Sequence, residues 1–376
     1  MATLQENTLL EDHDAYRDAI STVDANGKRI WLFPKQPKGW FTNFRQILYT
    51  FWVAVFLILP FVKIGGQPLF KFNIFEREFV FFAQPFYPQD FHLVVIGVII
   101  FFVFIALFTV TYGRLFCGFA CPQTVFMEGY FRRIEYWIEG DANQQKKLEA
   151  APWDANKISK KALKHGIFIL FSAIIGHWAM AYLVGYEQVI KFVTSPPSEN
   201  LSGFIGLVAF TVIFYLVFAK LREQACTVIC PYGRLQGVLY VKDTITVIYD
   251  WVRGEKRAHL KEQKAAPAGS FGDCIDCKLC VQVCPTGIDI RNGTQLECVG
   301  CTACIDACDD VMFKIDKPKG LIRFDSHNGI EKKQPWKFNA RSKAYTVILL
   351  LLMAGEGVLI ASRGLAEITV LRVPGQ

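Results

Sequence analysis

Long apolar runs separated by polar segments dominate the pattern of this sequence. A helix needs about 20 residues to cross the hydrocarbon core of a bilayer. Five runs approach or reach that length with few charges: residues 43–62, 91–112, 165–186, 201–219 and 343–362. Buried helices of soluble proteins seldom show five such runs, and the 52% hydrophobic content agrees with them. The pattern therefore predicts a mainly α-helical, polytopic membrane protein with five transmembrane helices in contact with the lipid bilayer.

Positive charge is distributed unevenly over the segments between these runs. Most of the 41 lysine and arginine residues lie before the first run, between the second and third, or between the fourth and fifth. Because cytoplasmic segments carry an excess of such residues, the N-terminus and these two segments are predicted to be cytoplasmic and the C-terminus external. The net charge of +7 gives no indication of nucleic-acid binding.

Eight of the 12 cysteines form two runs with the spacing Cys-x2-Cys-x2-Cys-x3-Cys. This is the ligand pattern of bacterial dicluster ferredoxins, in which the fourth cysteine of each run ligates the other [4Fe-4S] cluster. It predicts two clusters, with cluster 1 on Cys274, Cys277, Cys280 and Cys308, and cluster 2 on Cys298, Cys301, Cys304 and Cys284. Zinc is the alternative, but zinc sites favour two Cys-x2-Cys pairs about 15 to 20 residues apart. A reducing, cytoplasmic location suits the clusters and argues against disulfides.

The other four cysteines form two Cys-x3-Cys-Pro motifs. Each motif directly follows a pair of apolar runs, so the sequence predicts an ancient duplication of one unit, with the thiols Cys117, Cys121, Cys226 and Cys230. Four thiolates at one membrane face predict a metal or redox site, because thiolates bind soft metals and carry electrons. Cysteines that fill gaps between helix ends as small hydrophobic residues are the alternative.

The proline of each motif has a structural use. Pro122 and Pro231 suit the first position of a helix, where a missing N–H costs nothing, and this makes Cys121 and Cys230 the N-caps. The positive end of a helix lowers the pKa of a thiol and favours the thiolate. The stretch after Pro122 has apolar residues at helical spacing up to Trp137, which predicts an amphipathic helix on the cytoplasmic face.

One histidine lies in the middle of an apolar run. Ionisable groups inside membranes often serve a function, so His177 is a further candidate for a metal ligand or a proton carrier. A hydrogen bond to a neighbouring helix is the alternative for such a residue.

Together these features predict five parts of the chain. The first is a cytoplasmic N-terminal segment, 1–42. Residues 43–222 hold the first four transmembrane helices, the first Cys-x3-Cys-Pro motif and a cytoplasmic amphipathic loop. Residues 223–342 hold the second motif and a cytoplasmic 2[4Fe-4S] ferredoxin domain. The fifth transmembrane helix, 343–362, and a periplasmic tail, 363–376, complete the chain.

The run CPTGIDIRNGTQLECVGCTACIDACDDVM, the two Cys-x3-Cys-Pro motifs, the segment GLIRFD and the five-helix layout resemble the FixG/CcoG/RdxA family of cytochrome c oxidase accessory proteins. The resemblance implies a protein of the bacterial inner membrane that assists assembly of the cbb3-type oxidase and reduces Cu(II) to supply Cu(I). It implies partners among oxidase assembly factors or copper chaperones, and copper as substrate or bound ion at the four motif cysteines. Members usually continue into an external immunoglobulin-like domain, which we expect to be absent from a sequence that stops at Gln376.

The predicted function is electron transfer from an unidentified cytoplasmic donor through the clusters to the motif thiolates, where Cu(II) becomes Cu(I). A quinol-linked electron-transfer subunit, resembling the membrane ferredoxins of periplasmic nitrate reduction, is one alternative, and quinone-dependent cluster reduction distinguishes it. A non-catalytic assembly scaffold or copper carrier is another, distinguished by the lack of turnover with Cu(II). The sequence leaves the oligomeric state open, a homo-oligomer included.

Overall fold

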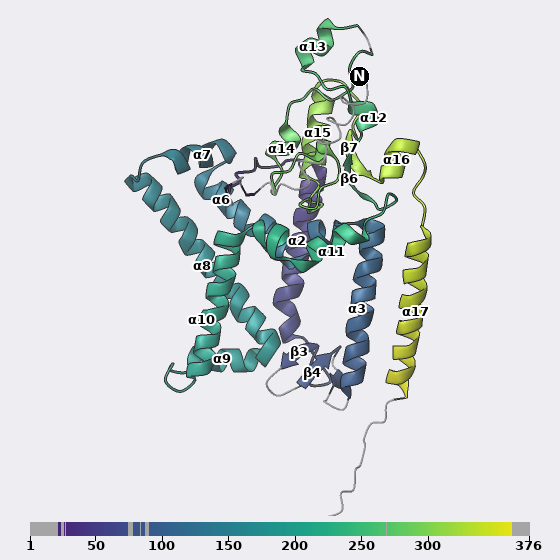
Figure 1. Cartoon of the computed structure of the whole chain (residues 1–376). Helices are drawn as coiled ribbons and strands as arrows, with labels where there is room; N and C mark the ends of the chain where they lie inside the picture. The colour runs from purple at the N-terminus through teal and green to yellow at the C-terminus, as the bar shows by residue number, and fades with distance from the viewer. Residues whose placement is uncertain are drawn as a thin grey trace, which may run out of the picture.

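The computed structural model describes residues 22–23, 26, 28–73, 78–82, 84–86, 90–267 and 269–362. Five helical stretches in these ranges are long and apolar enough to cross a membrane, which confirms the predicted number (Figure 1). They are α2 (Trp40–Ile58) continued by η1 (Leu59–Phe61), α3 (Phe91–Tyr112), α8 (Ala155–Val184), α10 (Leu201–Leu216) continued by η4 (Val217–Leu221), and α17 (Ala340–Ala361). The tail predicted at 363–376 and residues 1–21 of the N-terminal segment lie outside the described residues.

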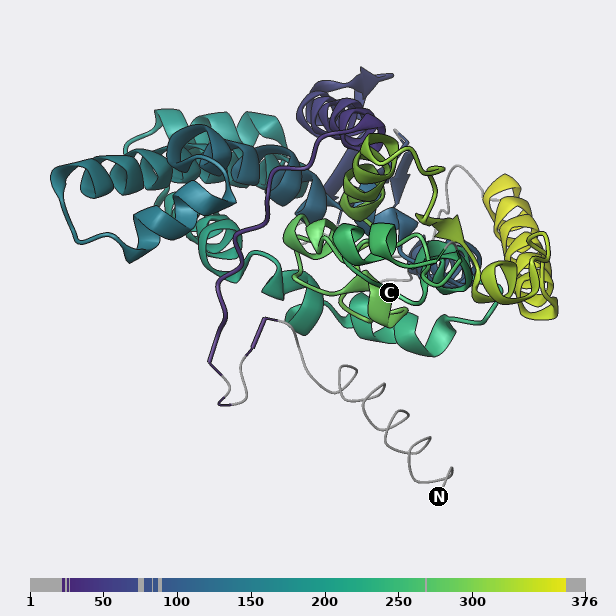
Figure 2. The ribbon, with the colours of Figure 1, turned by 90° about the horizontal axis from the view of Figure 1, so that it is seen from above.

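The membrane helices form two pairs. Helix α8 packs along α10, α3 packs along α17, and Figures 1 and 2 place α2 between the pairs. Small residues allow the close approach of α8 and α10, because a side chain at Gly176 would meet the backbone nitrogen of Thr211 at 3.2 Å. The other faces of these helices are largely exposed apolar surface, as expected of helices that face lipid.

Helix α8 starts well before the apolar run that predicted it. It begins at Ala155 rather than near residue 165, because the Asp154 carboxylate accepts a hydrogen bond from the backbone N–H of Lys157 at 2.8 Å and caps the helix. The added turns carry Lys161 and Lys164, which pair with Glu139 at 3.1 and 2.8 Å. The apolar run thus marked only the uncharged part of a longer helix.

Small antiparallel strands occupy the opposite end of the bundle from the cysteine-rich domain (Figure 1). The three-stranded sheet has the order β3 (Phe70–Asn73), β4 (Glu78–Phe81), β5 (Gln84–Phe86). Beside it, β1 (Lys63–Ile64) pairs with β2 (Gln67–Pro68). Helix α9 (Tyr186–Thr194) lies at the same end.

The cysteine-rich domain is built around one antiparallel strand pair, β6 (Thr246–Tyr249) with β7 (Ile322–Asp325). Buried residues of both strands, including Val247, Tyr249 and Ile322, pack against Cys274 and Cys280. Short helices complete the domain: α12 (Trp251–Gly254), α13 (Leu260–Ala265), α14 (Leu279–Gln282), η6 (Ile290–Asn292), α15 (Ala303–Lys314) and α16 (His327–Lys332).

Helix α15 caps the start of the first membrane helix. The Asp306 carboxylate accepts hydrogen bonds from the backbone N–H groups of Phe41 and Thr42 at 3.1 and 2.7 Å, and from the Thr42 hydroxyl at 2.6 Å. The first N–H groups of a helix have no partner within the helix, so a carboxylate from another element satisfies them. This cap fixes the cysteine-rich domain against α2.

The segment predicted as an amphipathic helix is helical, and it buries charged residues inside the protein. The segment consists of α5 (Pro122–Phe126), the π-helical η3 (Met127–Phe131) and α6 (Arg132–Glu139), followed by α7 (Ala142–Ala150). Val125 is buried and Trp137 is 77% exposed, while the charged Arg132, Glu135 and Glu139 of the same segment are buried. The charges are inside because they pair with cations and anions of neighbouring elements, which a hydrophobicity pattern does not report.

Candidate redox site

The cysteines of the two runs surround two hollows. The first is lined by Cys274, Cys277, Cys280 and Cys308 together with apolar residues of β6, β7 and α15. The second is lined by Cys284, Cys298, Cys301 and Cys304, and Cys280 lines it as well. Each hollow collects three cysteines of one run and the last cysteine of the other. Four thiols around an apolar hollow are a donor set that fits a [4Fe-4S] cluster.

The two hollows differ in their access to solvent. Cys277 of the first is exposed, whereas all four cysteines named for the second are buried or half-buried. Burial raises the pKa of the free thiols of Cys280 and Cys284 to about 12 in each case. These thiols are therefore protonated near neutral pH, and binding metal must release their protons.

The four thiols of the Cys-x3-Cys-Pro motifs converge at the membrane face. Cys117 lies in α4 (Leu115–Phe119) and Cys226 in η5 (Ala225–Ile229). Cys121 and Cys230 are the N-caps of α5 and α11 (Pro231–Leu239), with a proline as the first helical residue, as predicted. The thiols are close enough to interact electrostatically, since Cys117, Cys121 and Cys230 each affect the ionisation of Cys226.

The expected lowering of the Cys121 pKa is wrong for the free thiol. Burial raises this pKa, although the backbone N–H groups of Thr124 and Gln123 act in the opposite direction. Burial likewise raises the pKa of Cys117 to about 11, against hydrogen bonding by the Gln236 side-chain amide, 3.4 Å from Sγ. For both thiols the loss of hydration is the largest effect on the pKa and outweighs the hydrogen bonds that favour the thiolate.

Backbone geometry supports the duplication of the motifs. Gly113 and Arg222 stand at the same distance before Cys117 and Cys226, and their dihedral angles are nearly identical: φ 54°, ψ −125° and φ 52°, ψ −124°. This conformation suits glycine, so Arg222 is strained there. A bidentate ion pair with the Glu135 carboxylate, made of two hydrogen bonds of 2.9 Å, holds the Arg222 side chain in place.

The two motifs also contact each other. The Arg114 guanidinium donates to the carbonyl of Gly233 at 2.5 Å, and the Gln123 side chain donates to the carbonyl of Arg222 at 3.3 Å. Each bond joins one motif to the other. The motifs therefore form one structural unit.

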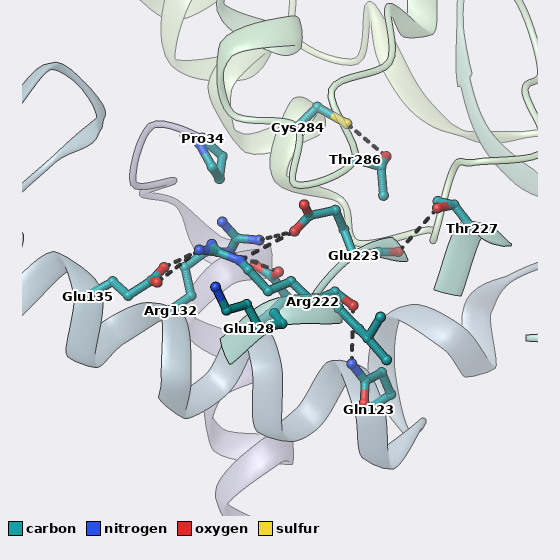
Figure 3. Close-up of polar contacts among 12 residues, drawn as sticks. Pro34, Gln123, Glu128, Arg132, Glu135, Arg222, Glu223, Thr227, Cys284 and Thr286 are labelled. Atoms are coloured by element: carbon teal, nitrogen blue, oxygen red, sulfur yellow. Dashed lines mark hydrogen bonds and ion pairs between the residues drawn. The ribbon is translucent and has the colours of Figure 1, made fainter. Parts of the chain in front are cut away.

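Ion pairs fasten this unit to its surroundings (Figure 3). Glu223 is 4% exposed and lies 2.9 Å from Arg29, 3.5 Å from Arg222 and 3.7 Å from Arg132. Arg132 also pairs with Glu128 at 2.9 Å. Sequence reasoning missed these residues, and the only signal was the position of Arg222, which matches Gly113 of the first motif.

The second hollow adjoins the motif thiols. Cys117 and Cys226 pack against a buried apolar group formed by Val283, Val299, Cys301 and Ala303. Gly118 touches the next loop so closely that a Cβ on it would lie 2.7 Å from the carbonyl carbon of Gly300. Cys117 and Cys226 therefore pack against a group that contains Cys301, a cysteine of the second run.

His177 is not brought to the thiols by any contact in the described part of the chain. Its Nδ1 lies 2.6 Å from the carbonyl of Ala173, one turn earlier in α8. Among the described residues, no three His, Cys, Asp or Glu side chains are grouped so that they could hold a single metal ion.

Comparison with known proteins agrees with this site. A family described as a 4Fe-4S dicluster domain matches residues 221–327, and a second, described as a 4Fe-4S binding domain, matches residues 94–140. The second match includes Cys117 and Cys121, which sequence reasoning had not assigned to iron–sulfur binding. No solved structure was found that matches the chain significantly.

Curated relatives cover most of the chain. "Protein RdxA" of Cereibacter sphaeroides is 37% identical over 355 residues, which are 88% of this chain and 71% of RdxA. "Nitrogen fixation protein FixG" of Rhizobium meliloti is 35% identical over 307 residues, 79% of this chain, and the match spans 57% of FixG. "Ferredoxin-type protein NapH" of Haemophilus influenzae is 24% identical over 246 residues, 60% of this chain and 68% of NapH.

The fold and the cysteine-lined hollows define the class: a membrane iron–sulfur protein that transfers electrons. The predicted fold class, with five transmembrane helices and a dicluster ferredoxin domain, is confirmed. Within that class the chain belongs to the FixG/RdxA family.

Proposed function

We propose that the chain passes electrons from a one-electron donor on the ferredoxin side to Cu(II) at the motif thiols and so supplies Cu(I). The observation that carries the proposal is the packing of Cys117 and Cys226 against the group that contains Val299 and Cys301. Electron transfer needs redox centres separated by a short, dry path. The buried packing of these two thiols against the group that contains Cys301 meets that need.

The cysteines have distinct roles in this proposal. Cys274, Cys277, Cys280 and Cys308 hold one [4Fe-4S] cluster, and Cys298, Cys301, Cys304 and Cys284 hold the other. When bound, such clusters supply one-electron reduction and oxidation without a change in protonation of substrate. The exposed Cys277 makes the first hollow the side from which a donor delivers electrons.

Copper is the substrate at the motif thiols. Each Cu(II) accepts one electron and becomes Cu(I), and the donor, a reduced one-electron carrier, loses one electron for each copper ion. Thiolates of Cys117, Cys121, Cys226 and Cys230 stabilise the Cu(I) product, because soft sulfur prefers the softer ion. His177 is a weaker candidate ligand, since its Nδ1 already bonds to Ala173.

Family membership supports a role in respiratory oxidase biogenesis. We propose that the Cu(I) serves the assembly of a cbb3-type cytochrome oxidase, through assembly factors or copper chaperones. The location would then be the bacterial inner membrane. A homo-oligomer is compatible with this role.

The purified protein, reduced with dithionite, freed of excess reductant and kept anaerobic, should reduce added Cu(II). A Cu(I)-specific chelator should record about one Cu(I) for each cluster electron, because each step transfers one electron. Oxidised protein is the matched control and should give none. Equal Cu(I) from oxidised and reduced protein would contradict the proposal and favour a scaffold or copper carrier.

The likeness to NapH supports a second candidate, a quinol-linked electron-transfer subunit of a periplasmic respiratory reductase. The source of electrons distinguishes the two functions. Rapid reduction of the oxidised clusters by a quinol, with slow reoxidation of the reduced protein by Cu(II), would favour the second candidate.

The charge distribution supports a topology with the N-terminus and the ferredoxin domain in the cytoplasm and the C-terminus in the periplasm. Reporter fusions after Leu260 should therefore give a cytoplasmic signal, and fusions after Arg372 an external one. A fusion within the segment between α8 and α10 serves as a second external control. An external signal at Leu260 would reverse the orientation.

A further inference from the structure

Five arginines among the described residues are buried, and they fall into two groups. Three have carboxylate partners: Arg132 with Glu128, Arg222 with Glu135, and Arg291 with Asp289 and Asp276. The other two, Arg45 and Arg114, form no ion pair with a carboxylate in the described part of the chain. Burying a guanidinium group without a counter-charge is strongly unfavourable. These two arginines therefore need an explanation.

Arg45 comes from the first membrane helix. Its side chain is inside the protein, with 6% of the residue exposed, and Nη1 donates a hydrogen bond to the carbonyl of Cys301. Its Nε has no hydrogen-bond partner. Glu128 is the carboxylate that interacts with it electrostatically, but Glu128 forms its ion pair with Arg132.

Arg114, the N-cap residue of α4, contacts the same loop, which contains Cys298 to Cys301. It is 5% exposed, its Nε also lacks a hydrogen-bond partner, and it lines a hollow together with Cys298 and Gly300. A Cβ on Gly300 would lie 2.8 Å from the Arg114 carbonyl oxygen, so the two backbones are in contact. Arg45 and Arg114 thus flank the loop 298–301 that carries two cysteines of the second hollow.

The two cations that line the first hollow are of a different kind. Arg291 is held by two carboxylates, Asp289 at 2.6 Å and Asp276, and Lys278 is exposed, so water screens its charge. A [4Fe-4S] cluster with four thiolate ligands carries negative charge, and this charge grows by one unit on reduction. Positive charge nearby stabilises the reduced state and raises the reduction potential.

We infer that Arg45 and Arg114 are the counter-charges of the cluster held by Cys284, Cys298, Cys301 and Cys304, and that they give this cluster the higher reduction potential of the two. The inference rests on the ligand sets of the proposed function, but it does not depend on copper. It gives the electron path a direction. An electron that enters near the exposed Cys277 moves to the second cluster, which has the higher potential and adjoins Cys117 and Cys226.

The test is a redox titration of anaerobic protein with dithionite and ferricyanide, followed by electron paramagnetic resonance. Arg45→Gln and Arg114→Gln should each make reduction of one cluster about tenfold less favourable, which lowers its potential by about 59 mV. The potential of the other cluster should not change. Cys284→Ser identifies the affected signal, because it alters a ligand of the membrane-side cluster only.

Controls separate charge from structure. Arg323→Gln removes an arginine of the same domain that pairs with Asp250 and Asp325, and it should leave both potentials unchanged. Arg45→Lys and Arg114→Lys keep the charge and should retain most of the parental potential. The two arginines belong to different elements. If one glutamine variant loses iron, the redox titration of the other glutamine variant still tests the inference.

Three results would overturn the inference: glutamine variants with full iron content and unchanged potentials, equal shifts of both clusters, or lysine variants that behave like the glutamine ones. Failure of the proposed function gives a different pattern. In that case the shifts appear as expected, while the parent protein fails to reduce Cu(II).

Discussion

Replacing both Cys121 and Cys230 with serine should lower Cu(II) reduction at least tenfold while the iron content stays at the parental level. Both residues are N-caps at equivalent places in the two motifs, and serine is a good N-cap of similar volume, so the local fold should survive. The variant loses two soft ligands for Cu(I), and with them part of the driving force for reduction. Iron content, Cu(I) affinity and the rate of Cu(II) reduction measure the effect.

Two other outcomes would be informative about the same thiols. Unchanged copper affinity and rate would remove these cysteines from the copper site and direct attention to His177. Loss of iron would show that the motif cysteines hold an iron–sulfur cluster, as the match of residues 94–140 to a 4Fe-4S binding domain allows. A single Cys277→Ser variant is the control for direct cluster damage, since Cys277 lines the first hollow and not the second, which adjoins the motifs.

Replacing Gly118 with alanine should slow Cu(II) reduction by roughly tenfold and destabilise the protein by about 1–3 kcal/mol, the usual cost of overpacking. The added Cβ would lie 2.7 Å from the carbonyl carbon of Gly300 and 3.1 Å from the carbonyl oxygen of Val299. Neither backbone atom can rotate away. The loop 298–301 must therefore move away from Cys117, which lengthens the path between the second hollow and the motif thiols.

Gly166→Ala is the matched control for this substitution. Gly166 lies on α8, where a Cβ would meet no atom within 4 Å, and alanine favours a helix over glycine. The control should therefore keep the parental rate and stability. Thermal unfolding and the rate of Cu(II) reduction are measured on both variants, and a parental rate in Gly118→Ala would contradict the short path through this contact.

The sequence predicted the membrane helices and the helix N-caps correctly. The five apolar runs found the five membrane helices because a helix in lipid must be apolar over its whole length, so composition alone marks it. Proline after Cys121 and Cys230 predicted two N-caps because proline tolerates only the first turn of a helix. The apolar runs did not predict the full length of every helix, because the charged first turns of α8 lie outside its run.

Sequence reasoning failed where burial competes with charge. It predicted a lowered pKa for Cys121, but packing of the two motifs removes water from the thiol and raises that pKa. It also did not predict that Arg132 and Glu135, on the helix that it expected to be amphipathic, are buried inside the protein. Their partners, Glu223 and Arg222, are distant in sequence, and no periodicity along one helix reports them.

The sequence by itself determined the membrane helices, the two motifs and the family, because each depends on residue type and spacing within a short stretch. Only the tertiary structure decided that the second hollow lies against Cys117 and Cys226, and that Arg45 and Arg114 contact the loop 298–301 without an ion pair to a carboxylate among the described residues. These facts depend on contacts between segments that are far apart along the chain. Such contacts set the local charge and dryness, on which the proposed direction of electron transfer depends.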